Sequence, residues 1–404
     1  MFSENITSSS PSSCHDTRHI KKGFQQLPAE LLVRIFILAQ NPELRLVMKT
    51  MYGISKSTLV RAQFLIERFG RSAALGERGM KSFRMASTVS VVDHLLKFRC
   101  DPRSDGDYLV WQACEQNNVP LFILVVDAIR PDSATLDRYL NRVAMMSEGM
   151  RMVDILVKRY GASIHHGDDT MMMLACAHHN INMVQHLISR YGCDPHFQRE
   201  RYLRRACLSG SEALVTLLLP GADIHCFNDA ALQNAAFKQH STIVDLLLKA
   251  GADPHANRNA SLLCAVQNND LTTIQLLLAA GADPRCRQDE PLRLACRHGD
   301  VTTVDCLIHA TDRVQDMVNC GNGMPLYEAL VAGHATVTMS LLSKGADANS
   351  PLALHGLQQA ILLNHLTCVQ IMANAGAMPV DPSSLFDKPR LSDSMRSLIQ
   401  SYFM

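Results

Sequence analysis

One short phrase returns along the chain at a nearly constant interval. Each copy is a Gly-Ala-Asp triplet, or a close variant, that follows a run of aliphatic residues. The glycines of these copies are Gly161, Gly192, Gly221, Gly251, Gly281, Gly345 and Gly376. They are 29 to 31 residues apart, except for one gap of 64 residues. A degenerate copy of the repeat lies in this gap and has Thr311 in place of glycine. A unit this short cannot bury its own apolar face, so the chain is predicted to stack its units around one continuous core.

A second landmark precedes each triplet. It is an alanine with an apolar residue three positions before it, a spacing that places both side chains on one face of a helix. Glycine or asparagine follows four positions later in most copies, and these residues readily adopt the left-handed conformation that ends a helix. The alanines are Ala113, Ala175, Ala206, Ala235, Ala265, Ala295, Ala329 and Ala360. Each unit is therefore predicted to contain a helix, a tight turn, a second helix and a loop, and we expect about ten units between Gly70 and Ala377.

These units resemble ankyrin repeats. The family's T-P-L-H-x-A pattern is kept best in EPLRLA at Glu290–Ala295 and in MPLYEA at Met324–Ala329. The resemblance implies an all-α, ankyrin-type helical repeat solenoid that binds a protein partner. The family period is about 33 residues, so the shorter period here implies short β-turn fingers in most repeats. Only the unit containing Asn322-Gly323 keeps the residues of a near-complete finger, and this dipeptide favours a tight turn.

The segment LPAELLVRIF near the N-terminus has a different character. Its apolar residues have helical spacing, and it resembles the F-box, which fungal-type proteins combine with ankyrin repeats. The resemblance implies that this apolar face contacts the small adaptor subunit of a cullin-type ubiquitin ligase. The contact residues would be Leu27, Pro28, Leu31, Leu32, Ile35 and Phe36. In the alternative interpretation the same face caps the first repeats near Val91 and Leu95, and the chain is a plain scaffold.

Four regions are expected. Residues 1–22 are Ser-rich and predicted to be disordered, 23–69 form the F-box-like helical module, 70–390 form the solenoid, and 391–404 form a C-terminal capping helix. Within the module, Met51 occupies the position at which the F-box pattern has tryptophan. The most degenerate copies of the repeat lie near 70–160 and 305–320.

Partner contact is expected on the concave face of the solenoid, in the columns two and three residues after each motif alanine. These positions point away from the packed alanine side. The candidate contact residues are His178, Phe237, Lys238, Gln267, Asn268, Arg297 and His298. A basic group offers a weaker site for an acidic peptide, and we interpret it as a solvated face. Its members are Arg201, Arg204, Arg205, Arg285, Arg287, Arg293 and Arg297.

The totals exclude several classes of protein. The formal net charge of +1 favours neither nucleic acid nor an anionic membrane, and no apolar run approaches the length that spans a bilayer. The polar N-terminus lacks the apolar core of a signal peptide, and the 13 cysteines show no CxxC motif. We therefore expect a monomeric, intracellular protein, in the cytoplasm, the nucleus or both, with protein partners and no nucleic-acid or membrane ligand.

Histidines and cysteines recur in columns rather than in clusters. His196, His225 and His255 share one column, and neighbouring helical layers lie about 8–10 Å apart, which is too far for nitrogens that bind one zinc ion at about 2 Å. We expect them to brace loops by hydrogen bonds. A cysteine column after the motif alanine indicates packing, and it contains Cys114, Cys176, Cys207 and Cys296. With no nucleophile or phosphate-loop motif, the chain is predicted not to be an enzyme and to have no catalytic, cofactor or metal site.

Overall fold

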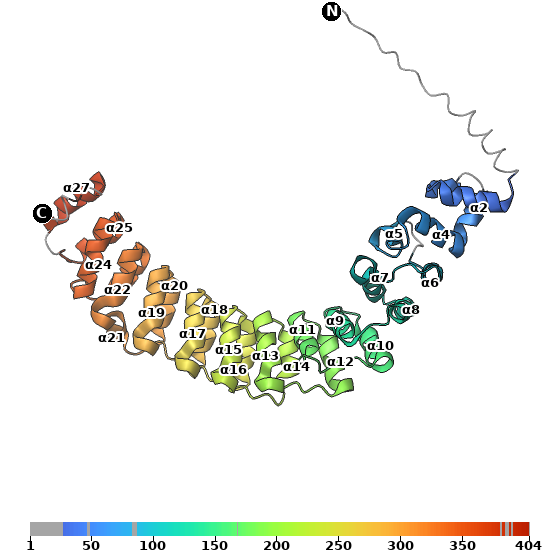
Figure 1. The fold of residues 1–404 in the computed structure, drawn as a ribbon. Helices are drawn as coiled ribbons and strands as arrows, with labels where there is room; N and C mark the ends of the chain where they lie inside the picture. Colours follow the sequence, from blue (N-terminus) through green and yellow to red (C-terminus); the bar gives the residue numbers. More distant parts are fainter. Residues whose placement is uncertain are drawn as a thin grey trace, which may run out of the picture. The chain divides into compact units, whose positions relative to one another are not determined.

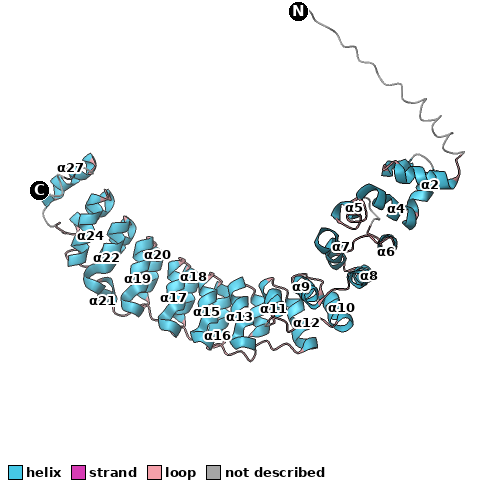
Figure 2. Ribbon diagram, in the orientation of Figure 1, coloured by secondary structure: helices cyan, strands magenta, loops and turns pink. Residues whose placement is uncertain are grey.

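The computed structural model describes residues 27–46, 49–82, 87–167, 169–379, 382–383, 388 and 391–403. The predicted disordered tail, residues 1–22, lies outside the described residues. Within the described ranges every regular element is a helix, which confirms the predicted all-α class (Figure 2). The chain forms two compact units, Met1–Leu174 and Ala175–Met404.

The first unit begins with a small helical module and continues with repeat helices. The helices of the module are α2 (Ala29–Leu38), the 3-10 helix η1 (Pro42–Leu46), α3 (Lys49–Lys56) and α4 (Thr58–Phe69). The repeat helices are α5 (Glu77–Lys81), α6 (Val89–Lys97), α7 (Ser104–Glu115), α8 (Val119–Ile129), α9 (Ser133–Ala144) and α10 (Met150–Tyr160). Helix α4 packs on α6, so the module covers the start of the repeats through α4.

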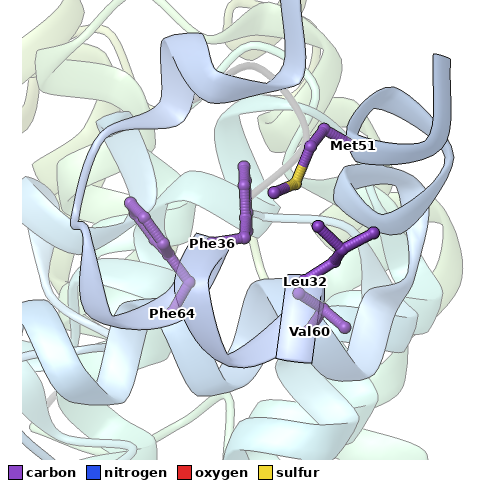
Figure 3. Close-up of a cluster of buried hydrophobic side chains, with 5 residues drawn as sticks. All are labelled: Leu32, Phe36, Met51, Val60 and Phe64. Atoms are coloured by element: carbon purple, nitrogen blue, oxygen red, sulfur yellow. The ribbon is translucent and has the colours of Figure 1, made fainter. Parts of the chain in front are cut away.

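The module has a hydrophobic core of its own. Leu32 and Phe36 lie on the buried side of α2 and pack with Met51 of α3 and with Val60 and Phe64 of α4 (Figure 3). The ring centroids of Phe36 and Phe64 are 5.5 Å apart. Met51 is 2% exposed, so its flexible side chain fills the centre of this core.

The second unit is a stack of helix pairs with one further helix at its end. The first helices of successive pairs contact one another and form one layer, and the second helices form another (Figure 1). The first helices are α13 (Phe197–Ser209), α15 (Cys226–Phe237), α17 (Ala256–Gln267), α19 (Cys286–His298), α22 (Cys320–Ala332) and α24 (Pro351–Leu362). The second helices are α12 (Ile181–Tyr191), α14 (Glu212–Leu218), α16 (Ser241–Lys249), α18 (Leu271–Ala279), α20 (Val301–His309), α23 (Ala335–Ser343) and α25 (Leu366–Asn374).

Two helices complete the described chain. Helix α11 (Thr170–Ala177) contains the boundary between the two units and is the first helix of the pair that ends with α12. Helix α27 (Asp393–Tyr402) packs on α25 and buries Met395 and Ile399 completely. From α5 to α25 the described helices form ten pairs, in agreement with the repeat count that the period predicts.

Polar caps begin several helices, and glycines end others, as the sequence spacing predicts for the glycines. The side chain of Asn180 accepts the backbone N–H of Met183 at 3.2 Å, and Asp270 accepts that of Thr273 at the same distance. Each cap satisfies a donor that the first helical turn leaves free. Gly192 ends α12 with a φ of 67°, in the left-handed region that glycine adopts without strain.

A left-handed turn of three residues opens most first helices. Residues 227–229 have φ values of 54° to 56°, a region that L-residues rarely occupy in succession. The same turn occurs at 105–107, 198–200, 257–259, 287–289 and 321–323. This compact turn takes the place of the family's β-turn finger. The prediction of a near-complete finger at Asn322-Gly323 is wrong, because these residues form the same turn and the extra residues before it form α21 (Val314–Val318).

The third residue of the turn is buried and joins its repeat to the next one. Glu200 Oε1 accepts the backbone N–H of Asp223 at 3.0 Å, and Asp229 Oδ1 accepts the backbone N–H of Asp253 at 2.9 Å. One repeat further along, an asparagine at the same place accepts the backbone N–H of Asp283 at 2.8 Å. These bonds satisfy buried polar groups on both sides of a repeat boundary, where an unpaired group would be costly.

Basic side chains brace the buried turn acids. His196 Nδ1 lies 2.9 Å from Glu200, and His225 Nδ1 lies 3.2 Å from Asp229. At the corresponding place in α19, Arg285 Nε donates to its own turn acid at 2.9 Å. A buried carboxylate is tolerated only when it is paired or hydrogen-bonded. The predicted role of the histidine column, to brace loops by hydrogen bonds, is confirmed for His196 and His225.

Histidine rings of a second column pack on glycines of the preceding repeat. A Cβ atom at Gly299 would lie 2.3 Å from His334 Nδ1, so a side chain there would displace the ring. The same contact joins Gly210 to His240 and Gly333 to His365. These glycines lie in the turn between the first and second helix of a pair. Where this position carries a side chain, the N-cap residue that faces it in the next repeat is smaller. An example is Asn269, whose side chain lies beside the first turn of α20, which Asp300 caps. Turn residue and facing cap are therefore matched in size.

This match predicts the outcome of exchanging one pair for the other. We expect Gly299→Asn to lower the free energy of unfolding by about 1–3 kcal/mol, because the new side chain displaces His334. Adding His334→Asp reproduces the Asn269–Asp300 pair and should recover most of the loss. Urea unfolding of the full chain measures both values.

The matched control is Gly251→Asn, since no atom lies within 4 Å of a Cβ at Gly251 and the change reports backbone strain alone. An equal loss of stability in the single and the double variant would contradict size matching.

Candidate functional site

The first-helix layer of the second unit carries the predicted partner contacts at the C-terminal ends of its helices. The exposed members are His178, Phe237, Lys238, Gln267, Arg297 and His298. Asn268 is half-buried because its Nδ2 donates to the carbonyl oxygen of Phe237 at 2.8 Å. This bond brings the ends of α15 and α17 together into one surface. Contact with a partner at these residues stays a prediction.

Phe237 is the large apolar side chain of this row. It is 52% exposed at the end of α15, and Lys238 Nζ lies 5.4 Å from its ring centroid. A cation at this distance is attracted by the ring. Aromatic residues, phenylalanine included, are enriched at the centres of protein–protein interfaces.

Arg297 differs from the rest of the row because its guanidinium is already engaged. Its Nε and Nη2 donate to the carboxylate of Glu328 at 3.0 and 2.7 Å, and these bonds raise the pKa of Arg297. Its carbonyl oxygen accepts a hydrogen bond from His334 Nε2 at 3.0 Å. Arg297 therefore joins α19 to the following repeat, whatever it contributes to partner binding.

A second exposed phenylalanine lies at the other end of α15, outside the predicted contact set. Phe227 is 52% exposed and is the first residue of the left-handed turn, with a φ of 54°. The guanidinium carbons of Arg204 and Arg199 lie 4.5 and 5.5 Å from its ring centroid. Column comparison is the signal that would have found it, since other repeats place polar residues or glycine there. Those residues are Asp105, Gln198, Asn257, Arg287 and Gly321.

The predicted basic group does not form one patch. Arg201, Arg204 and Arg205 belong to α13, and the other four arginines belong to α19 or its N-cap, with α15 and α17 between the two helices. Acids lie within 3.9 Å of every arginine of the α19 set. The acids are Asp289, Glu290 and Glu328. The charges of the α19 set are therefore largely neutralised.

A groove of about 900 Å³ opens beside the left-handed turn of α19. Burial and then the neighbouring Asp289 raise the pKa of Cys320 in its wall to about 12, so this thiol is a poor nucleophile. The charged side chains that line the groove are balanced between the two signs. The lining residues concerned are Arg285, Arg293 and Arg313, with Asp283, Asp289 and Asp312.

The N-terminal module separates the six residues predicted to contact an adaptor. Pro28 and Leu31 are exposed, Leu27 and Ile35 are half-buried, and Leu32 and Phe36 are 3% and 5% exposed. Leu32 and Phe36 fill the module's own core, so their side chains are not on its surface, and contact of the six residues with an adaptor stays a prediction. The apolar surface of the module extends to residues that were not predicted. They are Leu38, Leu46, Tyr52 and Leu59.

The cysteine column lies in the core. Its four members are at most 2% exposed, and burial raises the pKa of both Cys176 and Cys207 to about 12. A thiol that stays protonated is neither a nucleophile nor a ready metal ligand. Within the described ranges no cluster of three or more histidine, cysteine or acidic side chains is placed to hold a metal ion. None of the helices described is both long and apolar enough to cross a bilayer.

Sequence comparison agrees with the repeat geometry. The family model described as ankyrin repeats (3 copies) matches residues 140–228, 172–260, 203–288 and 262–351, and together these cover more than half of the chain. The chain belongs to the ankyrin repeat family. Ankyrin repeats are a non-catalytic fold that binds protein partners, so the solenoid is an interaction surface.

Other comparisons add the following. The crystal structure of the human ASB11 ankyrin repeat domain is similar at 19% identity and a TM-score of 0.43, covering 50% of this chain and 97% of that one. A family model described as the YDR249C N-terminal domain matches residues 25–56, which include α2, η1 and α3. No curated protein matches the chain. The F-box resemblance of the N-terminal segment therefore remains a proposal.

The packing role of the cysteines predicts their reactivity. In the native chain at pH 8, we expect iodoacetamide to modify Cys207 about a thousandfold more slowly than Cys226, because a thiol with a pKa of about 12 is almost fully protonated at that pH. Cys226 is the internal control, since it is only half-buried. Peptide mapping by mass spectrometry measures both rates. Similar rates at the two thiols would refute the buried column.

Proposed function

We propose that this chain links two proteins inside the cell. The ankyrin solenoid holds one partner, and the N-terminal module binds the second. We propose further that the second protein is the adaptor subunit of a cullin-type ubiquitin ligase, so that the first partner becomes a substrate. The observation that carries the proposal is that α2 is apolar on two sides while its own module covers only one of them.

The two sides of α2 are set by helical spacing. Leu32 and Phe36 face the module core. Leu31 and Leu38 are seven residues apart, which places them on a second stripe of the helix, while Ile35 between them is half-buried and packs against the module core. Leu31 and Leu38 are 47% and 60% exposed. These two exposed leucines lie beside the stripe that the module covers, and an exposed apolar stripe of this kind supports contact with another protein.

Neighbouring elements of the module also expose large apolar side chains. Leu46 of η1 is 68% exposed, Tyr52 of α3 is 48% exposed and Leu59 of α4 is 41% exposed. With Leu31 and Leu38, these make up five of the twelve large apolar residues that are exposed in the described chain. Such a concentration within 29 residues marks an interaction surface more often than scattered exposure does.

The capping alternative places α2 against the first repeats near Val91 and Leu95. In the structure α2 packs on α3 and α4, and its core cluster contains no residue of α6. Helix α4 is the element that contacts α6. The start of the stack is therefore covered by α4, which leaves the outward stripe of α2 for a partner and supports the linking function over a plain scaffold.

Substitution on the two sides of α2 tests the proposal. We expect Leu31→Arg combined with Leu38→Arg to leave the melting temperature unchanged, because both side chains already face solvent, and to abolish capture of the adaptor. The matched control is Leu32→Arg, which buries an unpaired charge in the module core and should cost several kcal/mol. Thermal unfolding and affinity purification from cells with mass spectrometry are the measurements.

The two halves of the proposal separate in this experiment. Ligase subunits should co-purify with the wild type and disappear from the double variant, while the solenoid's partner is retained in both. Absence of any adaptor from the wild-type sample would sink the ligase role. Loss of stability in the double variant would restore the capping interpretation of α2.

A further inference from the structure

The first-helix layer around α15 has a charge distribution that specifies the chemistry of its partner. We propose that α13, α15 and α17 bind an acidic protein segment that carries two large apolar side chains, one contacting each phenylalanine of α15. The inference rests on the proposed function of the solenoid as a partner-binding surface. It goes beyond that function by naming the kind of segment that binds and where.

The charges of these three helices are almost all positive. Their only acids, Glu200 and Asp229, are 4% and 3% exposed and are paired with histidines of their own repeats. The basic residues of the helices and of the α15 C-cap are Arg199, Arg201, Arg204, Arg205, Lys238 and Arg258. Five of these six residues, all but Arg201, are without an ion pair to any residue in the described part of the chain.

Two neighbouring regions show that this excess is local. The arginines of α19 lie within 3.9 Å of acids, so their charge is compensated. In the second-helix layer of the same repeats, Asp245 of α16 pairs with Lys249, and Glu212 of α14 accepts a hydrogen bond from Thr242. Unpaired cations on one layer alone, most of them exposed, favour a partner of opposite charge, through complementarity and faster encounter.

Aspartates do occur in the loops before these helices, but they are engaged in those loops. Asp194, Asp223 and Asp253 each accept the backbone N–H two residues further along, at 2.9, 3.2 and 2.9 Å. Each carboxylate therefore forms part of its own loop rather than an ion pair with the six basic residues of the surface.

Phe227 supplies the second observation. A bulky side chain at positive φ is a backbone outlier, and this ring is also half exposed to water. The equivalent residue in the next repeat is Asn257, which tolerates the same conformation at lower cost and exposes no apolar surface. A residue that is unfavourable in both respects and remains beside two unpaired arginines is a candidate anchor for a partner.

A nucleic acid is the other class of polyanion that a basic surface with exposed aromatic rings could bind. The geometry of the two phenylalanines disfavours nucleic-acid binding. Single strands bind by stacking bases on open aromatic faces. The guanidinium groups of Arg204 and Arg199 already lie over the Phe227 ring, at 4.5 and 5.5 Å from its centroid, and Lys238 lies 5.4 Å from the Phe237 centroid. The rings are therefore accessible to side-chain packing at their edges rather than to base stacking.

Fluorescence anisotropy with the full chain tests the proposal. The probe is a labelled peptide of about 16 residues, whose extended reach of about 50 Å exceeds the span of three helices at about 10 Å spacing. It is rich in glutamate and carries two phenylalanines, whose separation is varied in a small series. Comparison probes replace glutamate by lysine, replace phenylalanine by serine, or substitute an oligothymidylate of similar length. We expect only the acidic peptides with both phenylalanines to bind tightly, and at least tenfold more weakly as salt rises from about 0.05 to about 0.5 M.

Variants locate the site. Phe227→Asn copies the neighbouring repeat, so it should keep or raise the melting temperature while weakening binding about tenfold, and Phe237→Ser and Arg204→Glu should weaken binding as much. The matched controls lie on second helices, where Lys249 and Met339 are exposed. Lys249→Glu makes the same charge change in the same repeat as α15, and Met339→Ser removes an exposed apolar side chain. Neither should change the affinity.

Each outcome decides the proposal. Peptide binding that is lost with the first three variants and kept with both controls supports it. No binding by any acidic peptide, binding that survives Phe227→Asn and Arg204→Glu, or tighter binding of the oligothymidylate overturns it. If the solenoid still co-purifies a protein partner from cells and that capture is unchanged in these variants, the proposed function stands and only the acidic-segment inference falls.

Discussion

Three successive left-handed turns end in a buried side-chain oxygen that accepts a backbone N–H from the following repeat, and the stack depends on these contacts at the centre of the second unit. The turn is short because the repeat is short, and it leaves no hairpin to carry hydrogen bonds between neighbours. Glu200, Asp229 and Asn259 perform that task from inside the stack. Since two of the three are acids, each needs a basic brace, which the histidines supply. The unusual backbone, the buried charge and the histidine column are thus one arrangement.

Features that lie within a single repeat could be predicted from the sequence, because helix ends and packing columns are set by neighbours a few residues away. The glycine period, the motif alanine and the cysteine column predicted the helix pairs and their buried side. The left-handed turn could not be predicted, because only glycine and asparagine signal positive φ, and Phe227, Arg258 and Arg287 do not. The expected finger at Asn322-Gly323 failed for a different reason, because that dipeptide signals positive φ but suits either kind of turn.

Side chains that act across repeats were harder to place. The partner of Arg297 is Glu328, 31 residues away, and nothing in the sequence distinguishes this paired arginine from the unpaired Arg204. In the N-terminal module the sequence predicted an apolar helix but not which of its sides meets the core, because α2 has apolar residues on both. Leu31 and Leu32 are adjacent in the sequence, and only the position of Phe64 and Met51 decides that the second is buried and the first is not (Figure 3).

The size match between a turn residue and the ring or cap of the next repeat limits how such a chain can change its length. A deletion or duplication of one repeat creates a new neighbour at the junction. Removing the repeat that contains Gly299 would bring Asn269 against His334, a side chain against a ring with no space between them. The repeats of this chain therefore cannot be exchanged freely with one another. Recombination between repeats is tolerated only at junctions that place a glycine against each histidine of the second column, which contains His240, His334 and His365. This column therefore limits which repeats can be neighbours.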